Sequence, residues 1–303
     1  MKAKFSTASD IEQCRRIHKR FGTTYYYSTL RFPKSIQWKV HSIYAFVRVP
    51  DEWVDNPGEL DSDQRLDLLK NWREQLTLGV NGKRPEHFAM RAFCDAAIES
   101  RIPLDEAFLF LDAMEMDVSK NRYQTYEELE RYMRGSASAI GVMMCYAMCA
   151  RTDDDTISRA KALGEAMQLT NFLRDISEDL DRGRIYIPAE DMQRFGVTES
   201  DLQERIVTPQ FKDLMKFEIE RARKLYLVSD FGIYKLPPKM RKAVLLSRLL
   251  YSQILDRIEA QEYDVFRQRA RTNSIHKAKC AMSVILKDKA ILTKLVADSG
   301  VRI

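Results

Sequence analysis

The stretch that most constrains the fold runs from Gln168 to Pro188, where polar residues recur at helical spacing. Gln168, Asn171, Asp175 and Asp179 stand at i, i+3, i+7 and i+11. At about 100° per residue these side chains share one narrow stripe of a helix, beside its apolar stripe and not opposite it. A row of carboxamides and carboxylates next to the buried side of a helix is typical of a polar cleft in a helical bundle. The alternative is a solvated helix face.

A second stretch repeats this arrangement far earlier in the chain. Tyr44, Arg48, Asp51 and Asp55 are spaced i, i+4, i+7 and i+11. Each stretch has two aspartates four residues apart, with an arginine (Arg48 or Arg174) upstream. Aspartates at i and i+4 repel by a few tenths of a kcal/mol unless a cation or an arginine neutralises them. Two such stretches that face each other could hold several divalent cations between them.

Helical periodicity extends along the whole chain and predicts an all-α fold. No run of alternating residues predicts a strand, and neither of the usual glycine-rich nucleotide-binding loops occurs. No linker rich in Gly, Ser or Pro divides the chain, so residues 1–303 are expected to form a single domain around a central cleft. Besides the central stretch, helices are expected at about 7–20, 35–55, 61–77, 86–99, 103–119, from 125 onward, 208–231, 238–262 and 275–297.

Several local signals refine these helices. Pro50 is expected to kink the helix over 35–55, because proline removes a backbone hydrogen bond. Thr125 and Glu128 have the spacing of a capping box, and Asp153 to Asp155 are expected to cap the next helix. Small residues between Gly135 and Met148 leave room beside the backbone over one or two helical turns. Either another helix or a long apolar ligand fills that room.

Charge and cysteine content narrow the class of protein. The net charge of +5 over 303 residues favours an anionic substrate or a membrane surface and is too small to indicate nucleic acid. Five cysteines without a CxxC pair fit a reducing compartment. The uncharged stretch from Ala137 to Ala150 is too short to span a bilayer, and the N-terminus lacks an apolar signal core. The sequence therefore predicts a cytoplasmic protein. The basic last helix leaves peripheral contact with a membrane open.

Both acidic stretches resemble motifs of the squalene/phytoene synthase family, the head-to-head prenyl transferases of the isoprenoid-synthase fold. The resemblance covers nearly the whole chain, since five blocks occur in order. These are Tyr25–Pro33, Tyr44–Asp55, Asp117–Tyr132 with Gly141, Gln168–Pro188, and Tyr251–Leu255 with Tyr263–Arg269.

The first acidic stretch departs from the family pattern at three positions. Glu52 stands where the family usually has a second adjacent aspartate, a change expected to be tolerated. Pro50 and Trp53 are less usual, and they could alter the geometry beside the metals.

The resemblance implies roles for particular residues. It implies that Asp51, Asp55, Asp175 and Asp179 bind Mg²⁺, with Mn²⁺ as an alternative. The implied catalytic residues are Tyr44, Arg48, Tyr132, Asp51 and Asp175. The implied substrate-binding residues are Tyr26, Arg48, Gln168, Asn171, Arg174, Arg184, Tyr186, Tyr251 and Arg269, with Ala137 and Gly141 along the channel for the prenyl tails.

The implied reaction is a magnesium-dependent 1′-1 condensation of two prenyl diphosphates through a cyclopropylcarbinyl diphosphate. Two molecules of geranylgeranyl diphosphate would give phytoene, a step of carotenoid biosynthesis. Farnesyl diphosphate would instead give dehydrosqualene or squalene, and NADPH is needed only for squalene. A non-catalytic helical scaffold of the same fold is a third possibility, against which four closely placed carboxylates argue. A cyclising terpene synthase fits the paired acidic stretches poorly.

Overall fold

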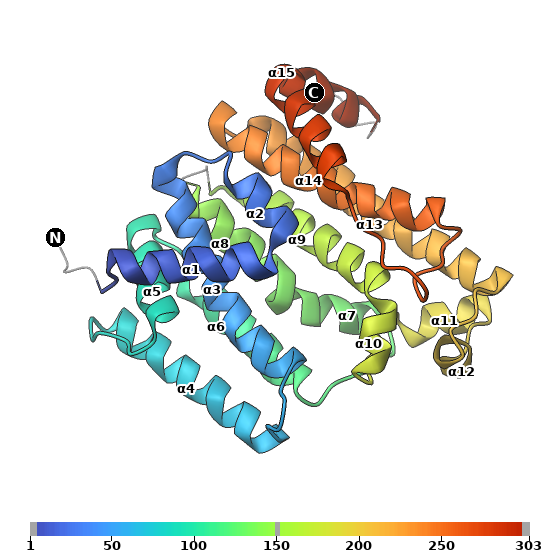
Figure 1. Cartoon of the computed structure of the whole chain (residues 1–303), viewed down its shortest axis with the longest axis horizontal. Coiled ribbons are helices and arrows are strands. Elements are labelled where there is room, and N and C mark those ends of the chain that lie inside the picture. Colours follow the sequence, from blue (N-terminus) through green and yellow to red (C-terminus); the bar gives the residue numbers. More distant parts are fainter. Residues whose placement is uncertain (1–4, 149–151, 299–303) are drawn as a thin grey trace.

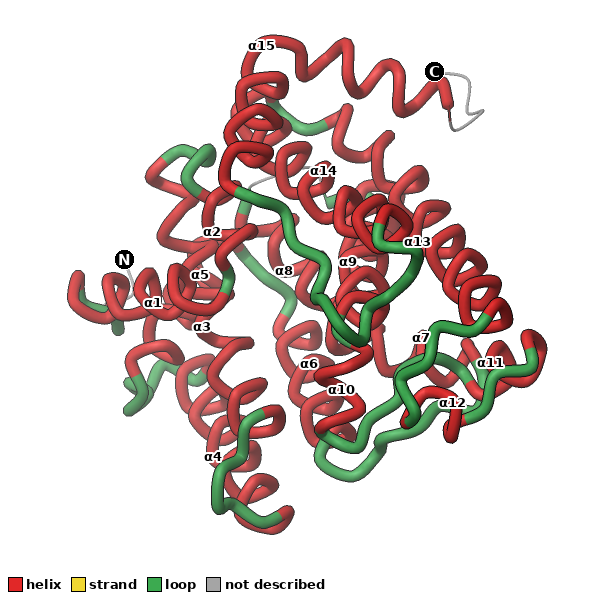
Figure 2. The backbone as a smooth tube through the Cα atoms, turned by 45° about the vertical axis from the view of Figure 1, so that its right-hand side comes forward, coloured by secondary structure: helices red, strands yellow, loops and turns green. Residues whose placement is uncertain are grey.

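The computed structural model describes residues 5–148 and 152–298, and within these ranges the chain forms helices and connecting loops (Figures 1 and 2). The predicted all-α fold is confirmed. The longer elements are α1 (Ala8–Phe21), α3 (Lys34–Asp55), α4 (Ser62–Val80), α5 (Phe88–Ser100), α6 (Leu104–Asp117), α9 (Asp154–Arg174), α13 (Pro209–Lys235), α14 (Pro238–Ala260) and α15 (Ser274–Asp298). The shorter ones are α2 (Thr23–Thr29), α7 (Tyr126–Met133), the π-helical turn η1 (Arg134–Ser138), α8 (Ala139–Ala147), α10 (Ile176–Asp181), α11 (Ala189–Phe195) and α12 (Glu199–Gln203).

The two acidic stretches lie on long helices that form different walls of the molecule. α9 packs along α13 and also contacts α8, η1 and α14, whereas α3 packs against α1, α5 and α8. α3 continues through Pro50 to Asp55, so the proline does not end it. The π-helical turn η1 and α8, which carry the small residues, lie between the two walls (Figure 1).

Capping side chains fix where several helices begin. The Thr7 hydroxyl accepts a hydrogen bond from the amide of Asp10, whose carboxylate accepts one from the amide of Thr7. Asp153 accepts from the amide of Thr156 and caps α9, as predicted. Thr125 caps α7, as predicted.

One half of the predicted capping box at α7 forms differently. The carboxylate of Glu128 accepts a hydrogen bond from the amide of Gln124 instead of the amide of Thr125. It also pairs with Lys120 at 3.2 Å, so it ties the start of α7 to the loop before it.

The central stretch is not one continuous helix, contrary to the prediction. α9 ends at Arg174 and α10 begins at Ile176, with Asp175 at φ −104° and ψ 14° between them. The carboxylate of Asp175 accepts hydrogen bonds from Arg174 and Arg269, which hold the residue at the break. The sequence also failed to predict α2, α11 and α12, because helices of five to seven residues are too short to show apolar periodicity.

Small residues allow α8 and α9 to approach each other at backbone distance. A Cβ atom on Gly141 would lie 2.4 Å from the carbonyl oxygen of Ala160, and one on Gly164 would lie 2.6 Å from that of Ala137. Tight helix packing therefore explains the small residues near Gly141. The same turns also border a cavity, so contact of this segment with a long apolar ligand stays a prediction.

Cys14, Cys94, Cys145 and Cys280 are buried thiols, and Cys149 lies outside the described residues. Over the described ranges, no helix is both long enough and apolar enough to cross a membrane.

Candidate active site

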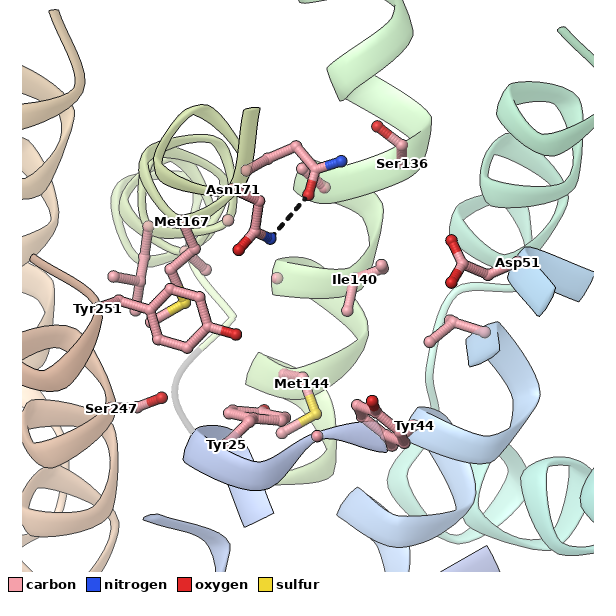
Figure 3. Close-up of a pocket in the computed structure, with 18 of the residues that line it drawn as sticks. Tyr25, Tyr44, Asp51, Ser136, Ile140, Met144, Met167, Asn171, Ser247 and Tyr251 are labelled. Atoms are coloured by element: carbon pink, nitrogen blue, oxygen red, sulfur yellow. Dashed lines mark hydrogen bonds between the residues drawn. The ribbon is translucent and has the colours of Figure 1, made fainter. Parts of the chain in front are cut away.

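A cavity of about 650 Å³ lies between α3, α8, α9 and α14 (Figure 3). At one end it is lined by Asp51 and Asp55 of α3 and by Asp175 and Asp179 of the opposite wall. The remaining wall is largely apolar, with residues such as Ile140, Met144, Met167, Ile233 and Val244. The two acidic stretches thus meet at one polar end of a cavity whose other end is apolar.

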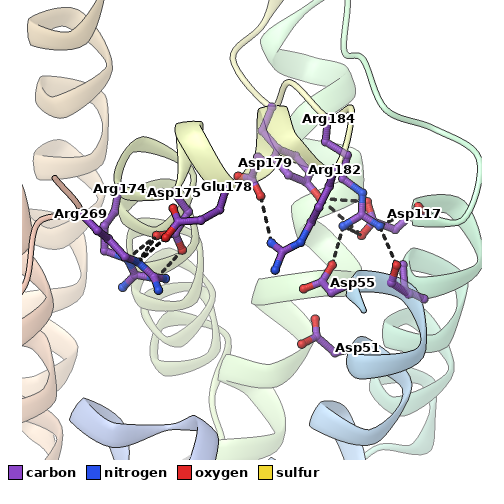
Figure 4. A network of polar contacts seen from close by, with 12 residues as sticks. Asp51, Asp55, Asp117, Arg174, Asp175, Glu178, Asp179, Arg182, Arg184 and Arg269 are labelled. Carbon is purple, nitrogen blue, oxygen red and sulfur yellow. Dashed lines mark hydrogen bonds and ion pairs between the residues drawn. The ribbon is translucent and has the colours of Figure 1, made fainter. Parts of the chain in front are cut away.

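The first pair of aspartates lies on the last turns of α3. Asp51 accepts a hydrogen bond from Arg48 at 2.5 Å, and Arg48 also pairs with Glu52. The Arg48 guanidinium lies over the ring of Phe21, 4.5 Å from its centroid. Asp55 is held by Arg184, a residue that follows α10 (Figure 4). Each carboxylate of this pair therefore has its own arginine.

The second pair is neutralised in the same way. Asp175 accepts hydrogen bonds from Arg174 at 2.7 and 2.5 Å and from Arg269 at 2.8 Å (Figure 4). Asp179 faces Arg182 at 3.5 Å. Arg174 and Arg269 were predicted to bind a diphosphate, and in this structure both bind the carboxylate of Asp175.

The carboxylates influence one another across the cavity. Burial raises the pKa of Asp179 to about 8, and the charges of Asp175 and Asp55 add to the effect. Burial also raises the pKa of Asp51 to about 7, with a further contribution from Asp55. The pKa of Asp117 rises to about 6, because burial and the nearby Asp55 outweigh the opposing effect of Arg184. Burial is the largest cause in all three cases, so the polar end of the cavity disfavours the charged form of these carboxyl groups, and a bound cation would stabilise that form.

Asp117 is a site residue that the sequence reasoning did not select. It lines the cavity from the end of α6, and its carboxylate accepts a hydrogen bond from the Tyr186 hydroxyl at 3.0 Å. Arg184 donates to the backbone carbonyls of Val54 and Asp117 at 3.2 and 3.3 Å. The sequence signal that could have identified Asp117 is its place at the start of the family-like block Asp117–Tyr132. Arg184 itself does not line the cavity but joins α3, α6 and the segment after α10.

Aromatic rings form a second layer around the polar end. Tyr186 stacks on Phe172 with 4.1 Å between ring centroids, and Tyr132 lies 5.8 Å from Tyr186. Burial raises the pKa of both tyrosines above the usual range, so both remain neutral phenols. Tyr132, Tyr186 and Tyr251 all line the cavity, as do Ala137 and Gly141.

Tyr44 faces the cavity and is supported from behind by a buried histidine. The ring of His18 lies parallel to that of Tyr44, with 4.1 Å between centroids and 10° between planes. His18 Nδ1 lies 3.0 Å from Nδ1 of His41. A Cβ atom on Gly22 would lie within 2.8 Å of both the His18 and Tyr44 rings, so only glycine leaves room for this stack.

Tyr26 is not placed where the sequence predicted. It does not line the cavity, and its hydroxyl accepts a hydrogen bond from Arg15 at 2.8 Å. Tyr25 lines the cavity instead (Figure 3). Neighbouring residues of a helix point in directions about 100° apart. Which of two adjacent tyrosines faces the cavity therefore depends on how the helix is oriented. The sequence did not predict α2, so it could not give that orientation.

The three departures from the family pattern leave the cavity's polar end intact. Glu52 shares Arg48 with Asp51, and Pro50 lies inside the continuous α3. Trp53 packs edge-on against Trp72 of α4 with 5.4 Å between centroids, and it does not line the cavity.

Gln168 and Asn171 extend the polar end along α9. Nδ2 of Asn171 donates to Oε1 of Gln168 at 3.4 Å (Figure 3). The Oδ1 atom of Asn171 is buried without a hydrogen-bond partner. Among the described residues, no three His, Cys, Asp or Glu side chains lie close enough together to hold a metal ion by themselves. A metal bound here would therefore need further oxygen ligands, from water, an amide or a substrate.

The sequence is similar to a known protein family and to proteins of known activity. Residues 18–275 match the family model described as squalene/phytoene synthase. The phytoene synthase of Arthrospira platensis is 37% identical over 294 residues, which cover 92% of this chain and 94% of that protein. The chloroplastic phytoene synthase of Daucus carota is 34% identical, over 96% of this chain and 72% of that protein.

Two solved structures share the architecture. A ligand complex of a dehydrosqualene synthase superposes with a TM-score of 0.85 at 27% identity, covering 93% of this chain and 97% of that one. The squalene synthase HpnC from Alicyclobacillus acidocaldarius superposes with a TM-score of 0.77 at 28% identity, covering 84% of this chain and 95% of that one.

Proposed function

The chain belongs to the squalene/phytoene synthase family and is a prenyltransferase, and on this premise we propose that it condenses two geranylgeranyl diphosphates head to head into phytoene. Cyanobacterial and plant phytoene synthases are 34% to 37% identical to it over most of its length. We also propose that residues 1–303 act as one catalytic unit, because the cavity takes lining residues from Arg20 to Arg269.

The observation that carries the proposal is the division of one cavity into an acidic end and an apolar end. A prenyl diphosphate has the same division, with two charged phosphates on a long hydrocarbon tail. Carboxylates cannot hold phosphates directly, since both are anions, so the acidic end requires cations between them. The four aspartates, all on the cavity wall, supply the hard oxygen ligands that Mg²⁺ prefers, and Mn²⁺ accepts the same set.

The residues of the cavity fit such a metal centre. Asp51, Asp55, Asp175 and Asp179 would be the protein ligands, and the unpartnered Oδ1 of Asn171 lies on the same wall. Bound Mg²⁺ would act as a Lewis acid that neutralises charge on the departing diphosphate.

The arginines can exchange partners when substrate binds. Arg48, Arg174 and Arg269 each hold a carboxylate in this structure. A planar guanidinium binds phosphate oxygens at least as well as carboxylate oxygens. With metals bound to the aspartates, these arginines would be free to hold the diphosphates, and Gln168 and Tyr251 lie on the same cavity wall.

Aromatic residues suit the cationic part of the reaction. Loss of diphosphate leaves an allylic cation, which the faces of Tyr44, Tyr132, Phe172 and Tyr186 can stabilise. The apolar walls exclude water, which would otherwise quench the cation. We propose that Arg184 acts indirectly, by holding Asp55 and Asp117 in place, because it does not line the cavity.

Farnesyl diphosphate is the alternative substrate. The structural neighbours named dehydrosqualene and squalene synthase favour it, at lower identity than the phytoene synthases. NADPH would be used only if the product were squalene.

Product analysis separates these possibilities. Purified protein is incubated with Mg²⁺ and either geranylgeranyl or farnesyl diphosphate, with and without NADPH, and the extract is analysed by mass spectrometry. The proposal requires a forty-carbon hydrocarbon formed without NADPH. A thirty-carbon hydrocarbon as the only product would transfer the assignment to the farnesyl branch.

A further inference from the structure

A second hollow lies behind the apolar end of the cavity, next to α15 and the turn between α2 and α3. It measures about 370 Å³, and its wall includes Phe32, Leu246 and Val284. Phe32 is buried and borders both the hollow and the main cavity. The hollow and the cavity are therefore neighbours that share the Phe32 side chain in their walls.

Exposed apolar side chains lie on the segments that line this hollow. Met282, Ile285 and Leu286 are 57%, 41% and 69% exposed, and their i, i+3 and i+4 spacing places them on one face of α15. Leu30, in the adjacent turn, is 46% exposed. Large apolar residues exposed together, unlike single ones, mark an interaction surface.

The same surface is strongly basic. The three segments that border the hollow, 30–35, 237–242 and 277–287, contain no Asp or Glu. Their cations are Arg31, Lys34, Lys239, Arg241, Lys242, Lys277, Lys279 and Lys287. Hereafter these three segments are called the basic apolar face.

Most of these cations point to an external partner. Five of the eight are exposed and form no ion pair with any residue that the structure describes: Arg31, Lys34, Lys239, Lys279 and Lys287. Two others have internal roles: Arg241 pairs with Asp288 at 3.0 Å, and Lys242 donates to the carbonyl of Ile285. The face therefore presents unneutralised positive charge beside exposed apolar side chains, as membrane-surface helices do.

The basic apolar face is remote from the acidic end of the cavity. α3 begins at Lys34, beside the face, and reaches Asp51 after about 25 Å of helix. In Figure 1, α15 lies at the opposite side of the molecule from α4.

We propose that the basic apolar face docks on an anionic lipid bilayer and turns the apolar end of the cavity toward the lipid. Lysine and arginine side chains attract anionic headgroups, and the exposed leucine, isoleucine and methionine side chains enter the interface. This orientation would help the product to leave, because a hydrocarbon has no polar group and enters lipid more readily than water. This part of the inference rests on the proposed function. An acidic protein would match the charge but would not account for the apolar end of the cavity behind Phe32.

Flotation with vesicles tests the docking surface without reference to catalysis. The full-length protein is mixed with vesicles of phosphatidylcholine alone or of phosphatidylcholine with phosphatidylglycerol. We expect flotation with the anionic vesicles only, and loss of binding at high salt, because the attraction is screened. Absence of binding, or equal binding to neutral vesicles, overturns the proposal.

Paired variants locate the surface. Lys239→Glu with Leu286→Ser should weaken binding to anionic vesicles by about tenfold or more, because each basic residue near the surface contributes about fivefold. Lys70→Glu with Leu66→Ser makes the same change on exposed positions of α4, and it should bind as the unmodified protein does. Equal loss in both variants, or in neither, contradicts the assignment of the face.

Activity in detergent keeps the two proposals separate. Neither variant touches the cavity, so product formation in detergent should be unchanged in both. With vesicles and no detergent, the variant with Lys239→Glu and Leu286→Ser should form product more slowly than the variant with Lys70→Glu and Leu66→Ser. If no substrate is converted under any condition, the proposed function fails while the flotation result still stands.

Discussion

Arg184 and Asp55 form an ion pair between two stretches of chain that lie 129 residues apart. Asp55 ends α3 on one wall of the cavity, and Arg184 follows α10 on the other. The same guanidinium reaches the backbone of Asp117 and lies 3.5 Å from its carboxylate. This pair therefore links the two walls that carry the acidic stretches.

Replacement of Arg184 by methionine should destabilise the protein by roughly 3 kcal/mol, because it leaves buried carboxylates without a counter-charge. Urea unfolding measures the change. Arg131→Met is the control, since its ion pair with Glu127 is exposed and contributes less than about 0.5 kcal/mol. Equal stability of the two variants would show that Arg184 is not a structural link.

His18→Ala should lower kcat/KM by about tenfold, because Tyr44 then loses the ring that holds it against the cavity. His18→Phe keeps a flat ring at this position and should retain most of the activity. Steady-state kinetics with the purified variants measures both, and circular dichroism checks that they fold. If the phenylalanine variant is as impaired as the alanine variant, the stack is not what positions Tyr44.

Gly141→Ala should destabilise the protein by about 2 kcal/mol, since its Cβ atom would lie 2.4 Å from the carbonyl oxygen of Ala160. Thermal or urea unfolding measures the loss. Ala290→Ser adds one heavy atom at an exposed position of α15 and should change stability by less than about 0.5 kcal/mol. A Gly141 variant of unchanged stability would mean that α8 and α9 are not in backbone contact.

The pair of Asp10 and Arg91 makes part of the stability depend on pH. Arg91 donates to both carboxylate oxygens of Asp10, at 3.1 and 2.6 Å, and this bonding lowers the pKa of Asp10 to about 2. A lowered carboxyl pKa stabilises the fold above the unfolded pKa of about 4, and the contribution disappears as the pH falls toward 2. Asp10→Asn should therefore cost about 2 kcal/mol at pH 7 and about half of that near pH 3, where the folded carboxyl group is still mostly ionised.

Urea unfolding at the two pH values measures this contribution. Asp63→Asn, at an exposed position of α4, is the control and should have little effect at either pH. A cost for Asp10→Asn that is the same at both pH values would exclude the charge of Asp10 as its cause.

The helical class and the acidic stretches were predictable because they depend on local spacing. Residues at i, i+3, i+7 and i+11 share a helix face whatever surrounds the helix, so Asp51 and Asp55 could be assigned to one wall. The partners of these residues could not be predicted in the same way. Arg184 holds Asp55, and His18 supports Tyr44, only because helices distant in sequence pack together.

Two predictions failed for the same kind of reason. Tyr26 was expected in the cavity, but the orientation of the short α2 turns Tyr25 inward. The helix was expected to continue through Asp175, but it breaks there, and the Asp175 carboxylate accepts a hydrogen bond from Arg269, 94 residues away. The cytoplasmic location, the single domain and the individual roles of the site residues stay predictions.

Product formation from geranylgeranyl diphosphate by Asp51→Asn and Asp175→Asn, with and without Mg²⁺, tests most directly whether the two acidic stretches act together through metal. Asp112→Asn, outside the cavity on α6, is the control. Because the two acidic stretches are proposed to hold the diphosphates jointly through metal, each cavity variant alone should lose product by about a thousandfold or more. The control should form phytoene only when Mg²⁺ is present. Phytoene from either cavity variant at the control's rate, or from the unmodified protein after complete removal of divalent metal, would contradict the account.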